Sequence, residues 1–551
     1  MNAMLWRRIG ISHILEFSFG ADFKNSSRRV LRIDQPSFGM GKRDYYVNKN
    51  YSRLLDSYLL YMVRSAVQLG ASESIAKSEM RLVLEFETAL AEISERSEDR
   101  RDVNLLHNPM TIRDLKLKYP NIDFNLWFST TASVGFDMDD YEIVNVDCPP
   151  YLKKLANVVA KFSARTHANY LLWRLTTALN RYLAPSLREN YRQFMQSVSG
   201  TPKFKPRWEE CINELLDHAG LPIGAIYVKK YFTAESKSEI DTMMATIRDA
   251  MKSTIDQTVW MDESTRTYAQ RKLAAMVHNM AFPADQLHNE TWLMRSYSEA
   301  KLEDDQYMHN AVSIWESSSN RSISEFRNLI DRTEWREGFA TVNAWYSPSK
   351  NKITFPAGIL RYPFFAQEAP SYVNYGRIGA IMGHELTHGF DDSGRQFDSD
   401  GNFILWWTNE TLLEFKNGAK CMIDQYSSVK DATTGLNLNG ANTQGENIAD
   451  NGGVKLSYKA FRARQQQRNE SVEALPAFQN YTADQLFFIA YGQVWCKLIR
   501  PEALQRQIIG DTHSPSEYRV NVVLQNNEDF ARAFSCPLNS FMNPVKKCKV
   551  W

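Results

Sequence analysis

The stretch IGAIMGHELTHGFDD, residues 378–392, contains the pattern HExxH, and the interpretation of the whole chain starts from it. If this stretch is helical, His384 and His388 lie one turn apart on the same face, with about 5–6 Å between their Cβ atoms. Two imidazoles at that spacing can share one zinc ion. Glu385, next to the first histidine, can then accept a proton from the attacking water and pass it to a leaving amine.

A catalytic zinc ion usually has three protein ligands, so a third ligand must come from another part of the chain. The segment NTQGENIADNGG, residues 442–453, offers Glu446, and Asp450 follows one helical turn later, where it can support a ligand histidine. Thr443 and Glu446 also match a capping box, in which the glutamate only closes the start of a helix. These residues alone leave both interpretations open.

Two further polar residues are candidates for the same site. Asp391 follows His388 by three positions and can accept the other ring N–H of a ligand histidine, or it can be a solvated acid at a helix end. His513 lies in GDTHSPSEYRV, residues 510–520, just before a predicted helix start. A histidine in a loop is commonly only exposed, so its role stays open at this point.

Composition and charge exclude several classes of function. The 551 residues provide room for two or three lobes with buried cores. The 65 lysines and arginines nearly balance the 64 acids, so the chain has no long-range attraction for nucleic acid. No apolar run is long enough to span a bilayer, and the first residues lack the uninterrupted apolar core of a signal peptide.

Six cysteines are present, and none are spaced as CxxC, which argues against a zinc site built from thiolates. Disulfides are the better interpretation, and they indicate an oxidising compartment.

The pattern of apolar residues predicts mostly helices. Amphipathic segments recur from about residue 51 to residue 335. Leu55, Leu59 and Met62 share one face of the first segment, and Val83, Phe86 and Leu90 share one face of the next. Between residues 341 and 360, two β-prone runs flank a turn that contains Pro348, which predicts a hairpin or an edge strand. Helical periodicity then resumes near Tyr375 and Thr443, so both metal motifs are expected on helices.

Further motifs, NAWY at 343–346, FPAGIL at 355–360, QVWC at 493–496 and CKVW at 548–551, follow one another along the chain. Together with the segments above, the sequence resembles the neprilysin and endothelin-converting enzyme family of zinc metallopeptidases over nearly its whole length. The resemblance implies a mainly α, two-lobed helical metallopeptidase that encloses a central cavity, with a small β element beside the HExxH helix. It also implies an N-terminal helical lobe at 1–285, a helical linker region at 286–342 and a zinc catalytic domain at 343–551.

The resemblance also implies a role for each site residue. His384, His388 and Glu446 would hold one Zn²⁺ per chain, Glu385 would be the general base, and Asp391 and Asp450 would orient the histidines. Asp450 and His513 would join Glu385 among the catalytic residues, with His513 stabilising the charged oxygen of the tetrahedral intermediate. The capping-box interpretation of Glu446 and the exposed-loop interpretation of His513 both become minor.

For the substrate, the resemblance implies that Asn343 and Ala344 bind the main chain and that Arg519 holds a carbonyl. The pocket for the residue after the scissile bond would be formed by Ile359, Phe364, Ala380, Ile381, Val494 and Trp495. Because these side chains are apolar, we expect hydrolysis of small peptides on the amino side of hydrophobic residues.

The same resemblance pairs Cys421 with Cys548. In relatives, cysteines that match Cys211, Cys496 and Cys536 pair with an N-terminal segment that this sequence lacks, and Cys148 has no assigned partner. Relatives also begin with a membrane anchor, so we expect an extracellular or cell-surface location, with membrane attachment only through an anchor absent from this chain. The alternative is a truncated, non-catalytic zinc-binding or scaffold relative, and the sequence does not indicate an oligomeric state.

Overall fold

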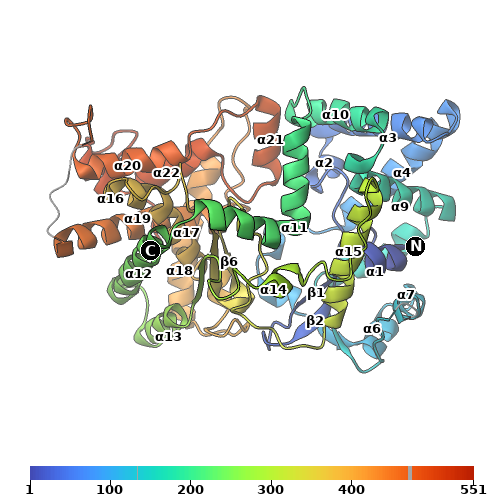
Figure 1. Ribbon diagram of the computed structural model, residues 1–551, viewed down its shortest axis with the longest axis horizontal. Coiled ribbons are helices and arrows are strands. Elements are labelled where there is room, and N and C mark those ends of the chain that lie inside the picture. Colours follow the sequence, from blue (N-terminus) through green and yellow to red (C-terminus); the bar gives the residue numbers. More distant parts are fainter. Residues whose placement is uncertain (133–134, 469–474) are drawn as a thin grey trace. The chain divides into compact units, whose positions relative to one another are not determined.

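The computed structural model describes residues 1–132, 135–468 and 475–551 (Figure 1). Within these ranges the chain is mainly helical and has two small β-sheets, which confirms the expected fold class. None of the helices described there is long and apolar enough to cross a membrane. The chain divides into two compact units, which we describe separately.

Unit 1 comprises residues 1–210, 295–330 and 500–506. It contains a four-stranded sheet in the order β1-β2-β4-β3, formed by β1 (Glu16–Ala21), β2 (Arg29–Asp34), β4 (Ile143–Val146) and β3 (Pro109–Thr111). Its helices are α1 (Asn2–Ile9), α2 (Asp44–Val47), α3 (Ser52–Gln68), α4 (Glu73–Ile93), α5 (Val103–Leu106), α6 (Ile112–Lys118), α7 (Phe124–Ala132), α8 (Pro149–Val159), α9 (Ala164–Ala178), α10 (Pro185–Ser199) and α15 (Tyr307–Ser324).

The sheet of unit 1 was not predicted, because its strands are short and pair over long distances in sequence. Ile33 of β2 lies opposite Val146 of β4, and no local periodicity indicates such a partner. The helical pattern was predicted correctly. In α4, for example, Val83, Phe86 and Leu90 are fully buried on one face.

Unit 2 comprises residues 211–294, 331–499 and 507–551. Its helices are α12 (Ala234–Gln257), α13 (Glu263–Ala274), α14 (Glu290–Met294), α16 (Ser371–Asn374), α17 (Ala380–His388), α18 (Asn409–Ser428), α19 (Gln444–Arg468), α20 (Ala483–Val494), α22 (Ser516–Asn526) and α23 (Glu528–Ala533). Two more helices, α11 (Arg207–Tyr231) and α21 (Pro501–Gly510), each contain a unit boundary. The sequence-based division at residues 285 and 342 stays a prediction.

The sheet of unit 2 has the order β5-β7-β6, with β5 (Val277–Ala281), β7 (Lys352–Pro356) and β6 (Trp345–Ser347). β6 and β7 are antiparallel and joined by a turn that begins at Pro348, which confirms the expected hairpin. β5 pairs in parallel with the other side of β7 and was not predicted. Both β5 and β6 are therefore edge strands within the described residues.

Two helices of unit 2, α17 and α19, pack against each other at very short range because glycines face each other. A Cβ atom added to Gly383 would lie 2.5 Å from the carbonyl oxygen of Gly453, and one added to Gly453 would lie 2.6 Å from the carbonyl oxygen of Ala380. Only glycine allows this approach of two backbones. The close packing sets the distance between the HExxH motif on α17 and the GENIAD segment on α19.

A disulfide joins Cys421 of α18 to Cys548, with 5.5 Å between the two Cα atoms, as the resemblance implied. The remaining four cysteines, Cys148, Cys211, Cys496 and Cys536, have free thiols.

Candidate active site

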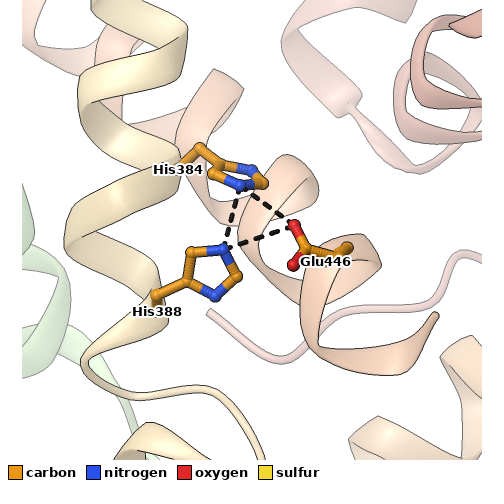
Figure 2. Close-up of side chains that lie close together, drawn as sticks. All are labelled: His384, His388 and Glu446. Carbon is orange, nitrogen blue, oxygen red and sulfur yellow. Dashed lines mark hydrogen bonds and ion pairs between the residues drawn. The ribbon is translucent and has the colours of Figure 1, made fainter. Parts of the chain in front are cut away.

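The two histidines of α17 and a glutamate from the first turn of α19 converge on one point (Figure 2). The Nε2 atoms of His384 and His388 are 2.9 Å apart. Oε2 of Glu446 lies 3.2 Å from Nε2 of His384 and 3.4 Å from Nε2 of His388. The group therefore combines residues from two segments that are about 60 positions apart in sequence. The glycine contact between α17 and α19 brings these segments together.

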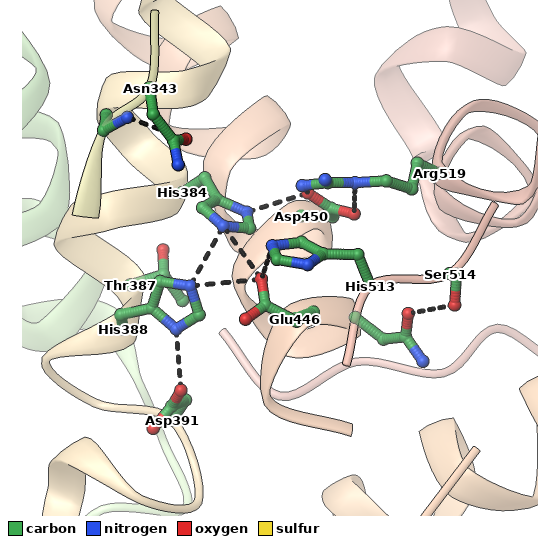
Figure 3. Close-up of polar contacts among 12 residues, drawn as sticks. Asn343, His384, Thr387, His388, Asp391, Glu446, Asp450, His513, Ser514 and Arg519 are labelled. Carbon is green, nitrogen blue, oxygen red and sulfur yellow. Dashed lines mark hydrogen bonds and ion pairs between the residues drawn. The ribbon is translucent and has the colours of Figure 1, made fainter. Parts of the chain in front are cut away.

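The hydrogen bonds of the two Nδ1 atoms, on the other side of each histidine ring, show that this group fits a zinc ion. Nδ1 of His384 lies 2.8 Å from Asp450, and Nδ1 of His388 lies 2.7 Å from Asp391 (Figure 3). An ionised carboxylate only accepts hydrogen bonds, so each Nδ1 carries the proton and each Nε2 presents a lone pair toward the shared point. Two imidazole nitrogens and one carboxylate oxygen form a donor set that zinc prefers.

Glu446 does not act as a helix cap. The hydroxyl of Thr443 instead accepts a hydrogen bond from Asn447 at 2.8 Å and donates one to the carbonyl of Asn439 at 3.0 Å. The carboxylate of Glu446 lies among the histidines, including His513 at 3.1 Å. Burial would raise the pKa of Glu446, but His388 and the hydrogen-bonding histidines hold it well below its usual range. The group therefore remains an anionic ligand candidate.

Asp450 has two partners, which fix its charge and position. Nε and Nη2 of Arg519 donate to its two carboxylate oxygens at 2.8 and 2.6 Å, and the guanidinium lies 3.9 Å above the ring of Trp495. Burial favours the neutral acid, but Arg519 and His384 lower the pKa of Asp450 to about 2. Within the described residues, Nη1 of Arg519 has no protein partner.

Glu385 and His513 line the same cavity but differ in exposure. Glu385 is only 4% exposed, burial raises its pKa, and its Oε2 has no hydrogen-bond partner in the part of the chain that the structure describes. His513, whose side chain is 43% exposed, lies 2.9 Å from Asp511 through Nδ1. Burial opposes the charged imidazole, but Asp511 and Glu446 raise the pKa of His513 to about 9.

Most of the sequence-predicted residues line one cavity of about 190 Å³. Its lining includes His384, Glu385, Asp450, His513, Arg519, Asn343, Ala344, Ile359, Phe364, Ala380, Ile381 and Trp495. Val494, the last residue of α20, is not among the lining residues. His388, Asp391 and Glu446 are not among the lining residues either; His388 and Glu446 complete the converging group, and Asp391 contacts Nδ1 of His388.

Comparison with known proteins places this geometry in a family. Residues 1–283 and 343–550 match the two models described as peptidase family M13. The chain belongs to peptidase family M13. It is 38% identical to neprilysin-2 of Drosophila melanogaster over 99% of this chain and 72% of that protein. It is 36% identical to neprilysin of Homo sapiens over 100% of this chain and 75% of that protein.

The chain is also similar to a solved structure of the zinc metalloprotease ZMP1 of Mycobacterium tuberculosis in complex with an inhibitor. The match has a TM-score of 0.89 and a sequence identity of 28%, and it covers 97% of this chain and 80% of that chain. Together with the converging His384, His388 and Glu446, these likenesses identify the protein as an M13 zinc metallopeptidase.

Some residues of this M13 site were not predicted from the sequence. Val342, Val454 and Tyr491 also line the cavity, and the hydroxyl of Tyr491 donates to the carbonyl of Arg519 at 2.6 Å. Tyr491 precedes Trp495 by four positions, so helical periodicity could have placed both on one face. The pairing of Arg519 with Asp450 had no signal in the sequence, because the two residues belong to different helices.

Proposed function

We propose that this M13 metallopeptidase is an endopeptidase that hydrolyses small peptides on the amino side of hydrophobic residues. The observation that carries the proposal is that one cavity is lined by His384 of the converging metal-binding group, by Glu385 and by apolar side chains. A cavity of about 190 Å³ suits a few side chains of an extended peptide and does not suit a folded protein.

One zinc ion per chain would be held by His384, His388 and Glu446. When bound, zinc supplies Lewis-acid polarisation of a carbonyl and lowers the pKa of a coordinated water. Asp391 and Asp450 keep the two rings in the tautomer whose Nε2 lone pairs face the metal position.

Glu385 is the proposed general base. Its carboxylate lines the cavity and has a free oxygen, so it can accept a proton from the attacking water and return it to the leaving amine. Because burial raises the pKa of Glu385, the carboxylate accepts that proton more readily than an exposed glutamate does. His513 is the proposed donor to the developing oxyanion, since its ring lies beside Glu446 and its raised pKa favours the charged, doubly donating form.

Substrate binding would combine backbone and side-chain contacts. β6 is an edge strand that directly follows Asn343 and Ala344, and an extended peptide can pair with such an edge. The unpartnered Nη1 of Arg519 can donate to a substrate carbonyl. Ile359, Phe364, Ala380, Ile381 and Trp495 would receive the side chain after the scissile bond, and we propose Val494 as a support behind them.

We further propose an extracellular or cell-surface location and small peptides, not nucleic acids, as partners. The disulfide between Cys421 and Cys548 supports the location, because disulfides persist in oxidising compartments.

The substitution Glu385→Gln tests the proposed chemistry. The isosteric amide cannot accept the proton, so we expect full zinc content but a fall in kcat of roughly 10²–10⁴-fold. The exposed Glu410 of α18 provides the matched control, since Glu410→Gln makes the same change away from the cavity and should leave kcat unaltered. An active Glu385→Gln variant would show that another group is the base.

A further inference from the structure

Lys272 of α13 is a buried charge that does not line the active-site cavity. The residue is only 1% exposed. Its Nζ donates to three backbone carbonyls, those of Gly389 at 2.7 Å, Gly394 at 2.6 Å and Phe397 at 2.7 Å. All three belong to residues 389–397, which directly follow the HExxH motif and which we call the 389–397 loop. One side chain therefore holds this loop at three points.

The surroundings of Lys272 select the charged ammonium. Burial lowers the pKa of Lys272 to about 7, and the charges of Asp391 and Asp398 oppose that shift. A neutral amine has only two N–H groups, and its lone pair would face the third carbonyl oxygen, whereas the ammonium has a donor for each carbonyl. Three aromatic rings also attract the positive charge, with Nζ at 5.8, 5.5 and 5.9 Å from the ring centroids of Tyr346, Phe390 and Trp406.

The 389–397 loop carries the carboxylate that orients His388. Oδ2 of Asp391 lies 2.7 Å from Nδ1 of His388 (Figure 3), and Oδ1 accepts from the backbone N–H of Gly394 at 2.6 Å. Gly394 is held from both sides, because its amide donates to Asp391 while its carbonyl accepts from Lys272. Hydrogen bonds therefore connect Lys272 to His388 through two residues of the loop.

The loop also folds back closely against the end of α17. A Cβ atom added to Gly394 would lie 1.8 Å from the carbonyl oxygen of His388. Because the amide of Gly394 holds Asp391, a displacement of Gly394 would move the carboxylate away from the ring of His388. Hydrogen bonds weaken steeply as their distance and angle depart from the best geometry.

We propose that Lys272 is a positioning residue for the metal site, because its ammonium fixes the 389–397 loop and thereby fixes Asp391 against the ring of His388. A partner that orients a ligand histidine contributes roughly 10–100-fold to metal affinity. The inference rests on the proposed binding of zinc by the converging group, and it adds a residue that touches neither the metal position nor the cavity.

The substitution Lys272→Met tests the proposal through the zinc affinity of the full chain, measured by competition with a chelator. The variant should fold, because methionine packs well among aromatic rings. Two of the three carbonyls also keep a donor: Gly394 accepts from the amide of Phe397, and Phe397 accepts from Nε1 of Trp406. We expect the dissociation constant for zinc to rise at least about tenfold. With Co²⁺ in place of zinc, the visible absorption bands should shift, because they report the geometry of the ligands.

Lys352 of β7 provides the matched control. It is also 1% exposed, and its Nζ donates to the carbonyl of Glu334 at 2.9 Å, outside the 389–397 loop. Lys352→Met therefore removes a second buried lysine and should leave both the zinc affinity and the Co²⁺ spectrum as in the unmodified protein. Equal losses of zinc affinity in the two variants would assign the effect to the loss of any buried lysine and overturn the proposal.

The substitution Asp391→Asn separates a positioning role from a merely structural one. If Lys272 acts through Asp391, Lys272→Met should weaken zinc binding by no more than about threefold in the Asp391→Asn background. Losses that simply multiply in the double variant would show that the two residues act independently, which contradicts the proposed path.

Amide hydrogen exchange of the unmodified protein tests the same connection without any substitution. Because coupling between two sites is reciprocal, removal of zinc should speed exchange in the α13 peptide that contains Lys272. Exchange in α4, which belongs to unit 1, should stay the same. Unchanged exchange in α13 would overturn the proposal even if Lys272→Met failed to fold.

The zinc measurements also distinguish a failure of this inference from a failure of the proposed zinc site. An unmodified protein that binds no zinc would overturn both. An unmodified protein that binds zinc, with a folded Lys272→Met variant that binds it within about twofold, would overturn only the role of Lys272.

Discussion

At the residue scale, the site depends on which ring nitrogen of each histidine carries the proton. Asp450 and Asp391 each accept from Nδ1, which leaves both Nε2 atoms free to bind a metal. Asp450 is held in turn by Arg519, which also presents Nη1 to the cavity. One arginine thus connects the metal-binding histidine with the proposed substrate position.

The apolar part of the cavity leads to a prediction about the substrate residue that follows the scissile bond. Burying a large apolar side chain there contributes roughly 1.5–3 kcal/mol, so replacing Phe by Ala at that position of a test peptide should lower kcat/KM at least about tenfold. Steady-state cleavage of two quenched peptides that differ only at that position measures the effect. Equal values of kcat/KM would show that Ile359, Phe364 and their neighbours do not form this pocket.

The sequence predicted the residues of the site better than their interactions. HExxH places two histidines and a glutamate by helical geometry alone, so His384, Glu385 and His388 could be predicted from local spacing. Glu446 was ambiguous between ligand and cap until its distances to the histidines were known. The contact between Arg519 and Asp450 joins two helices, and local sequence carries no information on such a contact.

At the element scale, the distance between α17 and α19 decides whether the metal-binding group can form. Gly453 lies where the two backbones meet, and a methyl group there would clash with backbone atoms of Ala380 and His384, each at 2.6 Å. We predict that Gly453→Ala forces α19 away from α17, costs about 1–3 kcal/mol of unfolding free energy and lowers zinc content. Denaturant unfolding and metal analysis of the purified variant measure both effects.

Gly492 of α20 provides the control for this substitution. A Cβ atom there meets only Val520, at an ordinary contact distance of 3.8 Å. Gly492→Ala should therefore be neutral, or stabilising by up to about 1 kcal/mol through helix propensity. If both variants keep full zinc content and equal stability, close backbone packing does not position the ligands.

The elements themselves were predictable only where their pattern is local. The hairpin of β6 and β7 followed from two β-prone runs around Pro348, and the amphipathic stripe of α4 followed from its periodicity. β5 was interpreted as part of a helical region, because its parallel partner β7 lies about 70 positions away. The facing glycines at 383 and 453 were visible in the sequence, but their contact was not.

At the scale of the whole molecule, the disulfide between Cys421 and Cys548 closes a sequence separation of 127 residues. A covalent link of that length restricts the unfolded chain strongly, so Cys548→Ala should lower the free energy of unfolding by roughly 2–5 kcal/mol. Denaturant midpoints under non-reducing conditions measure the change. Cys211→Ala replaces an exposed free thiol and should shift the midpoint little. An equal shift in both variants would show that the disulfide does not stabilise the protein.

We propose that the converging group of His384, His388 and Glu446 holds one zinc ion that supports peptide hydrolysis. Metal content and cleavage of a quenched peptide with a central hydrophobic residue, measured on one purified sample before and after chelation and after zinc is restored, test it most directly. We predict one zinc per chain, loss of cleavage with the chelator and recovery with zinc. Cleavage that persists after the zinc is gone, or a protein that holds zinc and cleaves no peptide, would show that this group is not the centre of a zinc peptidase.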